Sequence, residues 1–325
     1  MTEANKTGRV PVGVVGVGSL GQWHARVYSE IPEAELVGVY DINAARAAEI
    51  ADRYHTRVFP TIAELAGAVR AASVVVPPVQ HAAAALELMA HGAHVLVEKP
   101  IAASLPDAEA MIREARARRL ILQVGHVERF NPVLDYLQGI LNQPRYIEAI
   151  RLANYPPPRP GLPPRGTEVG VVYDMMIHDL EIILHLVASP VVDIQAVGVP
   201  VLSAAEDLAN VRLKFANGCV ANITASRISF ERTRKIRVFQ PDTYVSLDYG
   251  AQSGKLYRKV GMAITGGDVP IEKEEPLVRE LTHFVECVRT GAAPFVGGEE
   301  ALAALKLATA ICDEIRRNLP TTVPA

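Results

Sequence analysis

Short apolar runs alternate with segments of helical spacing over the first 125 residues of the chain. The runs Val10–Val15, Leu36–Tyr40 and His94–Val97 are typical of buried parallel strands. About five or six such strands alternate with helices, and the right-handed crossover rule then predicts a doubly wound parallel sheet. We therefore expect a nucleotide-binding Rossmann domain of the α/β class over residues 1–125.

The pattern changes after Gly125-His126, where apolar and polar positions alternate as in strands with one buried face. Asn217-Gly218 is a hairpin turn signal, and helices are expected at 132–141, at 168–187 and in two amphipathic segments that begin at Leu277 and Leu302. Residues 126–325 are therefore predicted to form an α+β substrate-binding and oligomerisation domain around a large, mainly antiparallel, open-faced sheet. Its predicted strands are Tyr146–Leu152, Val191–Val201, Leu208–Phe215, Cys219–Arg227, Thr233–Gln240, Tyr244–Asp248 and Lys255–Val260.

The composition narrows the class of partner. Lys and Arg number 33 against 36 Asp and Glu, a formal charge of −3, so the chain has no basic footprint for nucleic acid. A small-molecule substrate is favoured. At 325 residues the chain is also long enough to form two hydrophobic cores.

Cysteine usage and the N-terminal segment predict the location. Cys219, Cys287 and Cys312 are scattered without C-x-x-C or metal-ligand spacing, so we expect reduced structural thiols and neither a disulfide nor a metal site. Residues 1–9 are polar, and no window approaches about 18 consecutive apolar residues. The sequence therefore predicts a cytoplasmic protein without a membrane span.

A glycine-rich turn joins the first predicted strand to the helix that follows it. Gly16-Val17-Gly18-Ser19-Leu20-Gly21 is a G-x-G-x-x-G sequence in the strand-turn-helix context that binds dinucleotides. Its glycines permit a tight turn, close approach of the backbone to a pyrophosphate and close packing of the helix on the strand. The residues expected to contact the cofactor here are Gly16, Gly18, Ser19, Leu20 and Gly21.

Asp41 ends the second predicted strand, twenty positions after Gly21. This is the spacing expected of a carboxylate that binds the adenosine ribose hydroxyls, and a carboxylate would repel a 2′-phosphate. NAD is therefore the expected cofactor, although Arg46 leaves NADP open. Asp41 could also serve as the N-cap of a helix over residues 44–54.

Two further sequences lie at the expected carboxyl edge of the sheet. Pro77-Pro78 ends a predicted strand there, and Pro77 and His81 are candidates for cofactor contact. Glu98-Lys99-Pro100 ends the run His94–Val97, where open α/β sheets bind their ligands. Glu98 and Lys99 could meet a cofactor, or they could form only a strand-end ion pair before a proline that stops the strand.

Asp174 and His178 lie four positions apart in the helix predicted over residues 168–187. This spacing puts both side chains on one helix face, where a carboxylate can orient an imidazole for proton transfer. Such a pair is usually a solvated ion pair. The surrounding residues are apolar, however, and predict a largely buried helix.

Two features of the second half have open interpretations. The proline-rich segment over residues 155–165 predicts a stiff loop that either walls a substrate pocket or forms a surface arm. The basic cluster Arg232, Arg234, Lys235 and Arg237 lies in a strand, so its members alternate between the two faces of the sheet. A solvated or subunit-facing edge is favoured over a phosphate site.

The glycine-rich turn, Asp41, Glu98-Lys99-Pro100 and Asp174-Met175-Met176-Ile177-His178-Asp179 occur in this order along the chain. Together they resemble the glucose-fructose oxidoreductase / inositol dehydrogenase (Gfo/Idh/MocA) family of NAD(P)-dependent sugar oxidoreductases, and the resemblance covers nearly the whole chain. It implies that Lys99 and His178 handle protons and that Asp174 assists the histidine. It also implies a homodimer or homotetramer built through the C-terminal sheet.

Three stretches look most like the UDP-N-acetylglucosamine 3-dehydrogenases that supply a 3-amino sugar for lipid A, namely residues 125–132, 173–179 and 217–222. This likeness implies oxidation at C3 of a UDP-N-acetyl-hexosamine. Arginines can chelate a diphosphate through two hydrogen bonds. The candidates for substrate contact are therefore Arg129, Asn131, Arg165 and Arg227, with Asp174 and His178, and each of the first four could equally be structural.

We expect the sugar to lose a hydride to the nicotinamide ring and a proton to Lys99 or His178, with Glu98 positioning the lysine. Other substrates remain open, namely inositol, another free sugar or a UDP-N-acetylglucosamine uronate. A non-catalytic, dinucleotide-dependent sensor is the alternative from another class. The presence of Lys99, Asp174 and His178 argues against the sensor.

Overall fold

The computed structural model describes residues 8–158, 164 and 166–318, which fall into two compact units. Unit 1 comprises Met1–Phe130 and Glu274–Leu302, and unit 2 comprises Asn131–Lys273 and Ala303–Ala325. The chain therefore passes from unit 1 to unit 2 near the change of pattern at residue 125. It then returns to unit 1 for a segment that the sequence analysis placed with the second domain.

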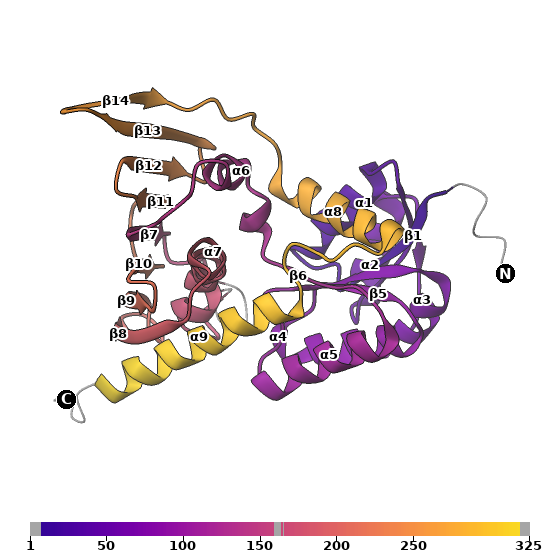
Figure 1. Cartoon of the computed structure of the whole chain (residues 1–325). Coiled ribbons are helices and arrows are strands. Elements are labelled where there is room, and N and C mark those ends of the chain that lie inside the picture. The colour runs from indigo at the N-terminus through magenta and orange to yellow at the C-terminus, as the bar shows by residue number, and fades with distance from the viewer. Residues whose placement is uncertain (1–7, 159–163, 165, 319–325) are drawn as a thin grey trace. The chain divides into compact units, whose positions relative to one another are not determined.

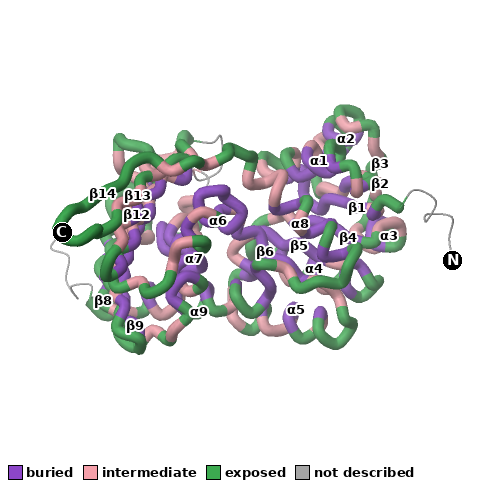
Figure 2. Tube along the Cα trace, turned by 45° about the horizontal axis from the view of Figure 1, so that its top comes forward, coloured by how far each residue is buried: buried purple, intermediate pink, exposed green. Residues whose placement is uncertain are grey.

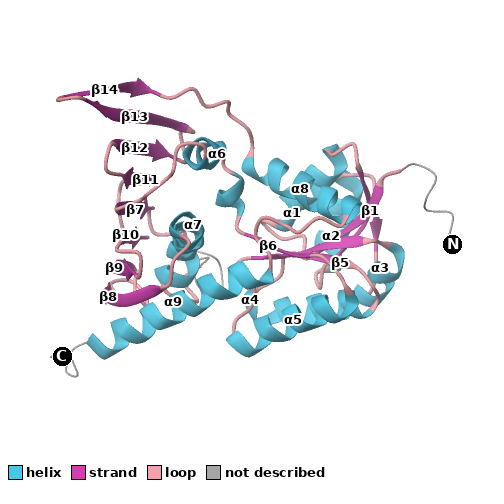
Figure 3. Ribbon diagram, viewed as in Figure 1, coloured by secondary structure: helices cyan, strands magenta, loops and turns pink. Residues whose placement is uncertain are grey.

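Unit 1 is built on a six-stranded sheet of order β3-β2-β1-β4-β5-β6 in which all pairs are parallel. Figures 1 and 3 show helices on both faces of this sheet. The predicted doubly wound Rossmann sheet is confirmed. Its strands are β1 (Val10–Val15), β2 (Ala34–Tyr40), β3 (Arg57–Val58), β4 (Ala71–Val74), β5 (His94–Glu98) and β6 (Leu122–Gly125), and its helices are α1 (Gly21–Glu30), α2 (Ala44–Arg53), α3 (Ile62–Ala68), α4 (Pro78–Ala90), α5 (Leu105–Arg118), η2 (Val127–Phe130) and α8 (Pro276–Thr290).

The apolar core of unit 1 explains why α8 belongs to it. Leu281, Phe284, Val285 and Val288 lie on one face of α8 and are almost completely buried. They join residues of α1, α2 and the sheet in a single hydrophobic cluster. Burial of this amphipathic face stabilises the return of the chain to the first unit.

Unit 2 contains an eight-stranded sheet of order β14-β13-β12-β11-β7-β10-β9-β8. Only the pair formed by β7 and β10 is parallel among these described strands, so the prediction of a mainly antiparallel sheet is confirmed. The strands are β7 (Tyr146–Leu152), β8 (Val191–Val199), β9 (Leu208–Phe215), β10 (Val220–Ser226), β11 (Thr233–Phe239), β12 (Thr243–Asp248), β13 (Ser253–Val260) and β14 (Ala263–Asp268), and the helices are α6 (Pro132–Gln138), η3 (Val172–Met176), α7 (Ile177–Val187) and α9 (Gly298–Asn318), which begins in unit 1.

The strands of unit 2 bury one face and leave the other more exposed. Along β7 and β9 the buried residues alternate strictly with half-buried or exposed ones. β14 is exposed along its whole length, as Figure 2 shows. This strand was not predicted, because Gly266 and Gly267 are unusual in strands. A Cβ at Gly266 would lie 1.9 Å from the carbonyl oxygen of Leu256, so the pairing with β13 requires a glycine there.

One predicted helix differs in its first turns. The sequence predicts a helix from residue 168, whereas the structure begins with a π-helical turn, η3, at Val172 and continues as α7 from Ile177. Widened turns of this kind are frequent at functional sites. They also change the angular spacing of the residues that the turn contains, among them Asp174.

The three cysteines, Cys219, Cys287 and Cys312, are buried free thiols. Within the described ranges, no helix is long and apolar enough to cross a membrane. The same part of the chain contains no group of three or more His, Cys, Asp or Glu side chains that could hold a metal ion.

Candidate active site

The turn between β1 and α1 uses its three glycines for different purposes. Gly16 has a φ of +85°, and a Cβ there would lie 2.6 Å from the carbonyl oxygen of Val75. A Cβ at Gly21 would lie 1.8 Å from the carbonyl oxygen of Gly16. Apart from its two chain neighbours, no described residue has a heavy atom within 4 Å of a Cβ placed at Gly18. The turn is thus tight at Gly16, packed at Gly21 and open at Gly18, as binding of a pyrophosphate requires.

Asp41 follows β2 and faces this turn. Its Oδ2 accepts a hydrogen bond from the backbone N–H of Val17 at 2.8 Å, and its Oδ1 accepts one from the N–H of Asn43 at 2.9 Å. The N-cap of α2 is Asn43, whose side chain accepts from the N–H of Arg46. The alternative role of Asp41 as the helix cap is therefore wrong, and its carboxylate instead lies beside the glycine-rich turn.

Arg46 covers the same turn from α2. Its guanidinium donates to the carbonyl oxygen of Val17 at 2.9 Å, to Gln22 Oε1 at 3.0 Å and to a carboxylate oxygen of Glu49 at 2.6 Å. These partners already neutralise and hold the guanidinium. Arg46 is thus less suited to bind a 2′-phosphate than its sequence position suggested.

A cavity of about 410 Å³ lies at the carboxyl edge of the sheet in unit 1. Gly16, Gly18, Asp41 and Pro77, all predicted to contact the cofactor, line it. Ser19 and Leu20 lead from the turn into the N-terminus of α1, with Gly21 as its first residue. The open backbone at Gly18, the helix N-terminus and the carboxylate of Asp41 fit the pyrophosphate and ribose of NAD.

The end of β5 presents Lys99. The backbone N–H of Lys99 donates to Glu98 Oε2 at 3.1 Å, and the Lys99–Pro100 peptide bond is cis. His81 is buried between two carbonyl oxygens, with Nδ1 2.9 Å from that of Pro100 and Nε2 2.9 Å from that of Val76. Burial lowers the pKa of His81. These contacts make His81 a positioning residue beneath the Lys99 segment, and its contact with the cofactor stays a prediction.

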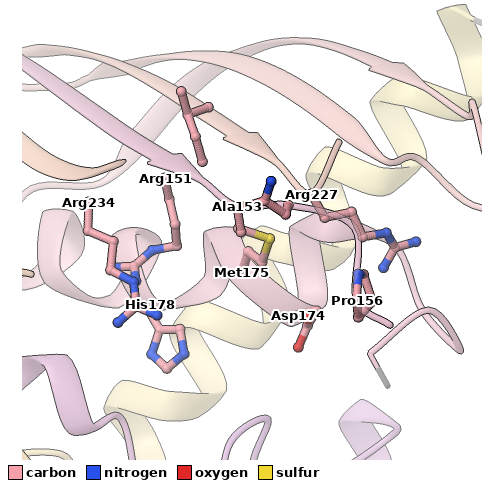
Figure 4. A pocket seen from close by; sticks show the side chains of 10 residues that line it. Arg151, Ala153, Pro156, Asp174, Met175, His178, Arg227 and Arg234 are labelled. Atoms are coloured by element: carbon pink, nitrogen blue, oxygen red, sulfur yellow. The ribbon is translucent and has the colours of Figure 1, made fainter. Parts of the chain in front are cut away.

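A second cavity, of about 270 Å³, lies within unit 2 and brings together Asp174 and His178. Figure 4 shows both side chains extending from the same side of the η3 and α7 helix into this pocket. Both are only half-buried, so a ligand can reach them. The remaining lining residues are Arg151, Leu152, Ala153, Asn154, Pro156, Met175, Arg227 and Arg234.

Two of the three pocket arginines are held in buried ion pairs. Arg151 donates to both carboxylate oxygens of Asp179, at 2.7 and 3.0 Å. Arg227 donates to Asp207 Oδ1 at 2.7 Å and to the carbonyl oxygens of Gly166 and Val169, at 2.6 and 2.8 Å. Arg227 was predicted to bind substrate, and these contacts show how it holds the segment next to the pocket.

Arg234 lies directly opposite Arg151 on the neighbouring strand β11, and both side chains line the pocket (Figure 4). Lys235 and Arg237 occupy the other face of the sheet, where they pair with Asp248 at 3.7 Å and Glu148 at 2.7 Å. The basic cluster is thus divided as the period of a strand requires. The predicted solvent exposure of Arg234 is confirmed, and its side chain also lines a pocket.

The other predicted substrate contacts lie elsewhere. Asn131 is the buried N-cap of α6, and its amide donates to the carbonyl oxygen of Tyr249 at 3.1 Å. Arg129 is buried in η2 of unit 1. Arg165 lies outside the described residues. Asn131 therefore has a clear structural role in unit 2, while substrate contacts of all three stay predictions.

Comparison with known proteins supplies the family. Residues 10–126 match the family model described as oxidoreductase family, NAD-binding Rossmann fold, and residues 137–242 match that of the GFO/IDH/MocA C-terminal domain. A UDP-N-acetylglucosamine 3-dehydrogenase of Acidithiobacillus ferrooxidans is 37% identical over 302 residues, which cover 90% of this chain and 94% of that protein. The chain belongs to the Gfo/Idh/MocA family.

Further relatives and structures agree with this assignment. A scyllo-inositol 2-dehydrogenase (NAD(+)) of Bacillus subtilis is 26% identical and covers 96% of each chain. The solved structure of the UDP-N-acetylglucosamine 3-dehydrogenase from Acidithiobacillus ferrooxidans superposes with a TM-score of 0.89 at 35% identity, over 95% of this chain and 98% of that one. The protein is therefore an NAD-binding oxidoreductase of the Gfo/Idh/MocA family.

The pocket also contains Arg151, Asn154 and Arg234, which were not predicted as site residues. The sequence contained one indication for Arg151. It lies at one of the alternate positions of the predicted strand over residues 146–152 whose side chains are buried. A charged residue at such a position needs a partner or a function. The partner of Arg151, Asp179, is distant in sequence and could be identified only from the fold.

Proposed function

We propose that this Gfo/Idh/MocA protein oxidises the C3 hydroxyl of UDP-N-acetylglucosamine, or a closely related UDP-N-acetyl-hexosamine, to the 3-keto sugar with NAD⁺. The observation that carries this proposal is the pocket of unit 2, where Asp174 and His178 share a cavity with arginine side chains. Substrate identity is further supported by the 37% identity to the Acidithiobacillus ferrooxidans enzyme of that name. A nucleotide-sugar offers both a hydroxyl for the acid–base pair and a diphosphate for a guanidinium.

Bound NAD⁺ supplies the hydride acceptor. The chain's own residues would bind and orient the sugar, and they would accept the proton of its hydroxyl. Lys99, held at the end of β5 by its backbone bond to Glu98, is one proposed proton carrier. His178, with Asp174 to orient it, is the other, and both of these side chains belong to unit 2.

Arg234 is the residue proposed to bind the diphosphate. Like charges directly opposite each other in a sheet destabilise it, yet Arg234 faces Arg151 across β11 and β7. Asp179 compensates the charge of Arg151 through two hydrogen bonds. Arg234 is exposed and lines the pocket, so its guanidinium can form two hydrogen bonds with a diphosphate.

NADH formation from a substrate panel tests the proposal. Purified protein and NAD⁺ would be offered UDP-N-acetylglucosamine, its uronate, inositol and glucose, and absorbance of the reduced nicotinamide would be followed. We expect turnover with UDP-N-acetylglucosamine above all others. A preference for inositol or glucose would refute the nucleotide-sugar assignment, and no turnover with any member would favour a dinucleotide-dependent sensor.

The proposed proton carrier is tested by Lys99→Ala. We expect turnover to fall by about 10²-fold or more, the range typical of a lost general acid–base group, with NAD⁺ affinity nearly unchanged. Lys235→Ala is the matched control, because Lys235 pairs with Asp248 on the opposite face from the pocket of unit 2. If Lys99→Ala turned over as fast as this control, Lys99 would have no role in proton transfer.

The diphosphate contact is tested by Arg234→Gln. We expect the KM for UDP-N-acetylglucosamine to rise by about tenfold, equivalent to about 1.4 kcal/mol of binding, with a smaller change in kcat. Lys235→Gln, on the adjacent position of β11, should leave KM unchanged. Equal KM values for the two variants would contradict the assignment.

We further propose that the protein forms homodimers or homotetramers through the outer face of the unit 2 sheet. Tyr146, Phe239, Tyr244 and Tyr257 form a row across four strands of that face, with ring centroids 4.6 to 6.0 Å apart. All four are half-buried or exposed. Such an aromatic row can pack against the same row of a second copy of the chain. Phe239→Asp should therefore shift the mass measured by light scattering toward that of the monomer.

The cellular setting follows from the same proposal. The substrate and NAD⁺ are cytoplasmic metabolites, and the buried free cysteines suit a reducing compartment, so we place the protein in the cytoplasm. The sequence resemblance implies that the 3-keto product is converted to the 3-amino sugar of lipid A. Activity in the soluble fraction of disrupted cells would test the location.

A further inference from the structure

A layer of polar side chains is buried in unit 1 between the sheet and the helices α1 and α8. Ser73 pairs in register with Leu96, and Leu96 pairs with Gln123, so these three side chains point to the same face of the sheet. Glu98 lies on this face one step nearer the carboxyl edge. The polar members are His24 and Tyr28 from α1, Ser73 from β4, Glu98 from β5, Gln123 from β6 and Glu280 from α8, of which only Glu98, at 7%, is exposed at all.

Hydrogen bonds join four of these side chains into a continuous path. Tyr28 OH lies 2.8 Å from Ser73 Oγ, which lies 3.1 Å from His24 Nδ1. His24 Nε2 lies 3.1 Å from Glu98 Oε1, and Glu98 Oε2 accepts the backbone N–H of Lys99 at 3.1 Å. The path therefore runs from the interior of α1 to the backbone of the proposed proton carrier.

The neighbouring strand leaves room for the carboxylate at the end of this path. A Cβ at Gly125, opposite Glu98 on β6, would lie 2.9 Å from the Glu98 carboxyl group. Any larger residue there would displace the carboxylate from His24 and Lys99. The position of Glu98 is thus fixed from both neighbouring elements.

Glu280 enters the layer from α8 as a second carboxyl group. Its side chain is fully buried, and neither carboxyl oxygen has a hydrogen-bond partner among the described residues. Gln123 donates its amide N–H to the backbone carbonyl oxygen of Glu280 at 3.2 Å, and its own Oε1 is likewise buried and without a partner. An ionised Glu280 would add only acceptors to this group, whereas a protonated one would add the missing donor.

The two carboxyl groups of the layer differ in charge. Burial, and then the nearby charge of Glu98, raise the pKa of Glu280 well above its ordinary value. Burial acts on Glu98 in the same direction, but the hydrogen bond and charge of His24 and the charge of Lys99 outweigh it and lower the pKa of Glu98. Two nearby carboxyls with opposite shifts are the usual arrangement of one acid and one base.

We propose that the layer is a positioning device for Lys99, in which Glu98 is the only carboxylate and Glu280 is a carboxylic acid that keeps its proton at neutral pH. This inference rests on the proposed function of Lys99. The geometry supports it because six polar side chains occupy a place where apolar residues would pack at lower cost. A second carboxylate in the layer would repel the charge of Glu98, the group that holds the backbone of Lys99.

Other charged groups in the same region complete the electrostatic setting. The titratable or charged side chains that act on Glu98, Glu280 or their neighbours are His24, Tyr28, His81, Lys99, His126 and Arg129. Burial lowers the pKa of His126 to about 3, so this imidazole is neutral at pH 7, and burial also lowers the pKa of His81. His126 therefore supplies no charge that would stabilise an ionised Glu280.

Infrared spectroscopy tests the proton directly and does not depend on turnover. Wild-type protein at pH 7, well above the ordinary Glu pKa of about 4.3, should show the C=O stretch of a buried carboxylic acid, shifted in D₂O. Glu280→Gln should lack this band. No such band in the wild type, or an unchanged band in Glu280→Gln, would overturn the inference. The absence of turnover with every sugar of the panel would instead count against the proposed function.

Kinetics test the positioning role. Glu280→Ala should lower kcat severalfold with unchanged NAD⁺ affinity, and Glu280→Gln should recover most of the loss with the pH profile of the wild type, because its neutral amide replaces a neutral acid. Glu98→Gln should lower kcat and shift the pH profile. If Glu280→Gln shifted the profile as Glu98→Gln does, Glu280 would be ionised in the working enzyme. If Glu280→Ala did not fold, the comparison of Glu280→Gln with wild type would still decide the point.

Discussion

Replacing Asp207 by asparagine tests the ion pair that holds the border of the unit 2 pocket. Asp207 is fully buried and accepts three backbone N–H groups on Oδ2, from Val201, Leu202 and Ser203, at 2.9, 2.6 and 2.9 Å. Its Oδ1 accepts Ser203 Oγ at 2.8 Å and Arg227 Nε at 2.7 Å. An asparagine amide would turn its NH₂ group toward donors in either orientation.

The expected cost follows from these contacts. Breaking a buried ion pair by removing one charge destabilises a protein by about 3 to 5 kcal/mol, since the other charge remains buried. For a domain of this size class, each kcal/mol lowers Tm by about 2 to 4 °C, so a fall on the order of 10 °C is expected. The pocket should also loosen, because Arg227 holds the carbonyl oxygens of Gly166 and Val169.

The pH dependence has a definite sign. Although burial opposes it, the hydrogen bonds from the backbone and Arg227 hold the pKa of Asp207 far below its ordinary value. A depressed folded-state pKa contributes stability above the unfolded value of about 3.9, and this contribution is lost as the pH falls toward the folded value. The Tm difference between wild type and Asp207→Asn should therefore be largest near neutrality and narrow below about pH 5.

Thermal unfolding followed by circular dichroism is the assay, with Asp193→Asn as the matched control. Asp193 is exposed on β8 and accepts one hydrogen bond from Gln195 at 3.2 Å. Its replacement should change stability by no more than about 0.5 kcal/mol. If Asp207→Asn and this control had the same Tm at pH 7, the five hydrogen bonds of Asp207 would not contribute the stability expected of them.

Three further outcomes are expected. Gly16→Ala should destabilise the protein by about 1 to 3 kcal/mol and abolish NAD⁺ binding in calorimetry. Gly18→Ala should leave Tm unchanged and weaken only NAD⁺ binding. Equal Tm losses in the two variants would contradict the assignment of the tight turn to Gly16 and of the open position to Gly18. Asp41→Ala should weaken NAD⁺ about tenfold in the same titration, and unchanged affinity would exclude a ribose contact. Phe215→Ala, at a position 1% exposed, should cost about 3 to 5 kcal/mol in urea unfolding, and a loss below about 1 kcal/mol would show that the core refills the cavity.

Local sequence determined the features that depend on neighbouring residues. The run Val10–Val15 and the turn that follows specify a strand, a positive-φ glycine and a helix N-terminus, because each needs only its own residues and their immediate partners. The alternation along β7 likewise determined which side chains are buried. Asp41 could be assigned to the turn from spacing alone, because a strand and a helix have fixed lengths per residue.

Tertiary structure decided which polar residues serve which site. Arg227 and Arg234 look alike in sequence, yet the fold pairs the first with Asp207 and aligns the second with Arg151 in the pocket. Because α8 returns to unit 1, Glu280 lies in a buried layer whose other members are more than a hundred positions away from it in the sequence. Register and long-range packing set these contacts, and neither can be calculated from periodicity, because the free energy of a buried charge depends on partners that only the folded chain brings near.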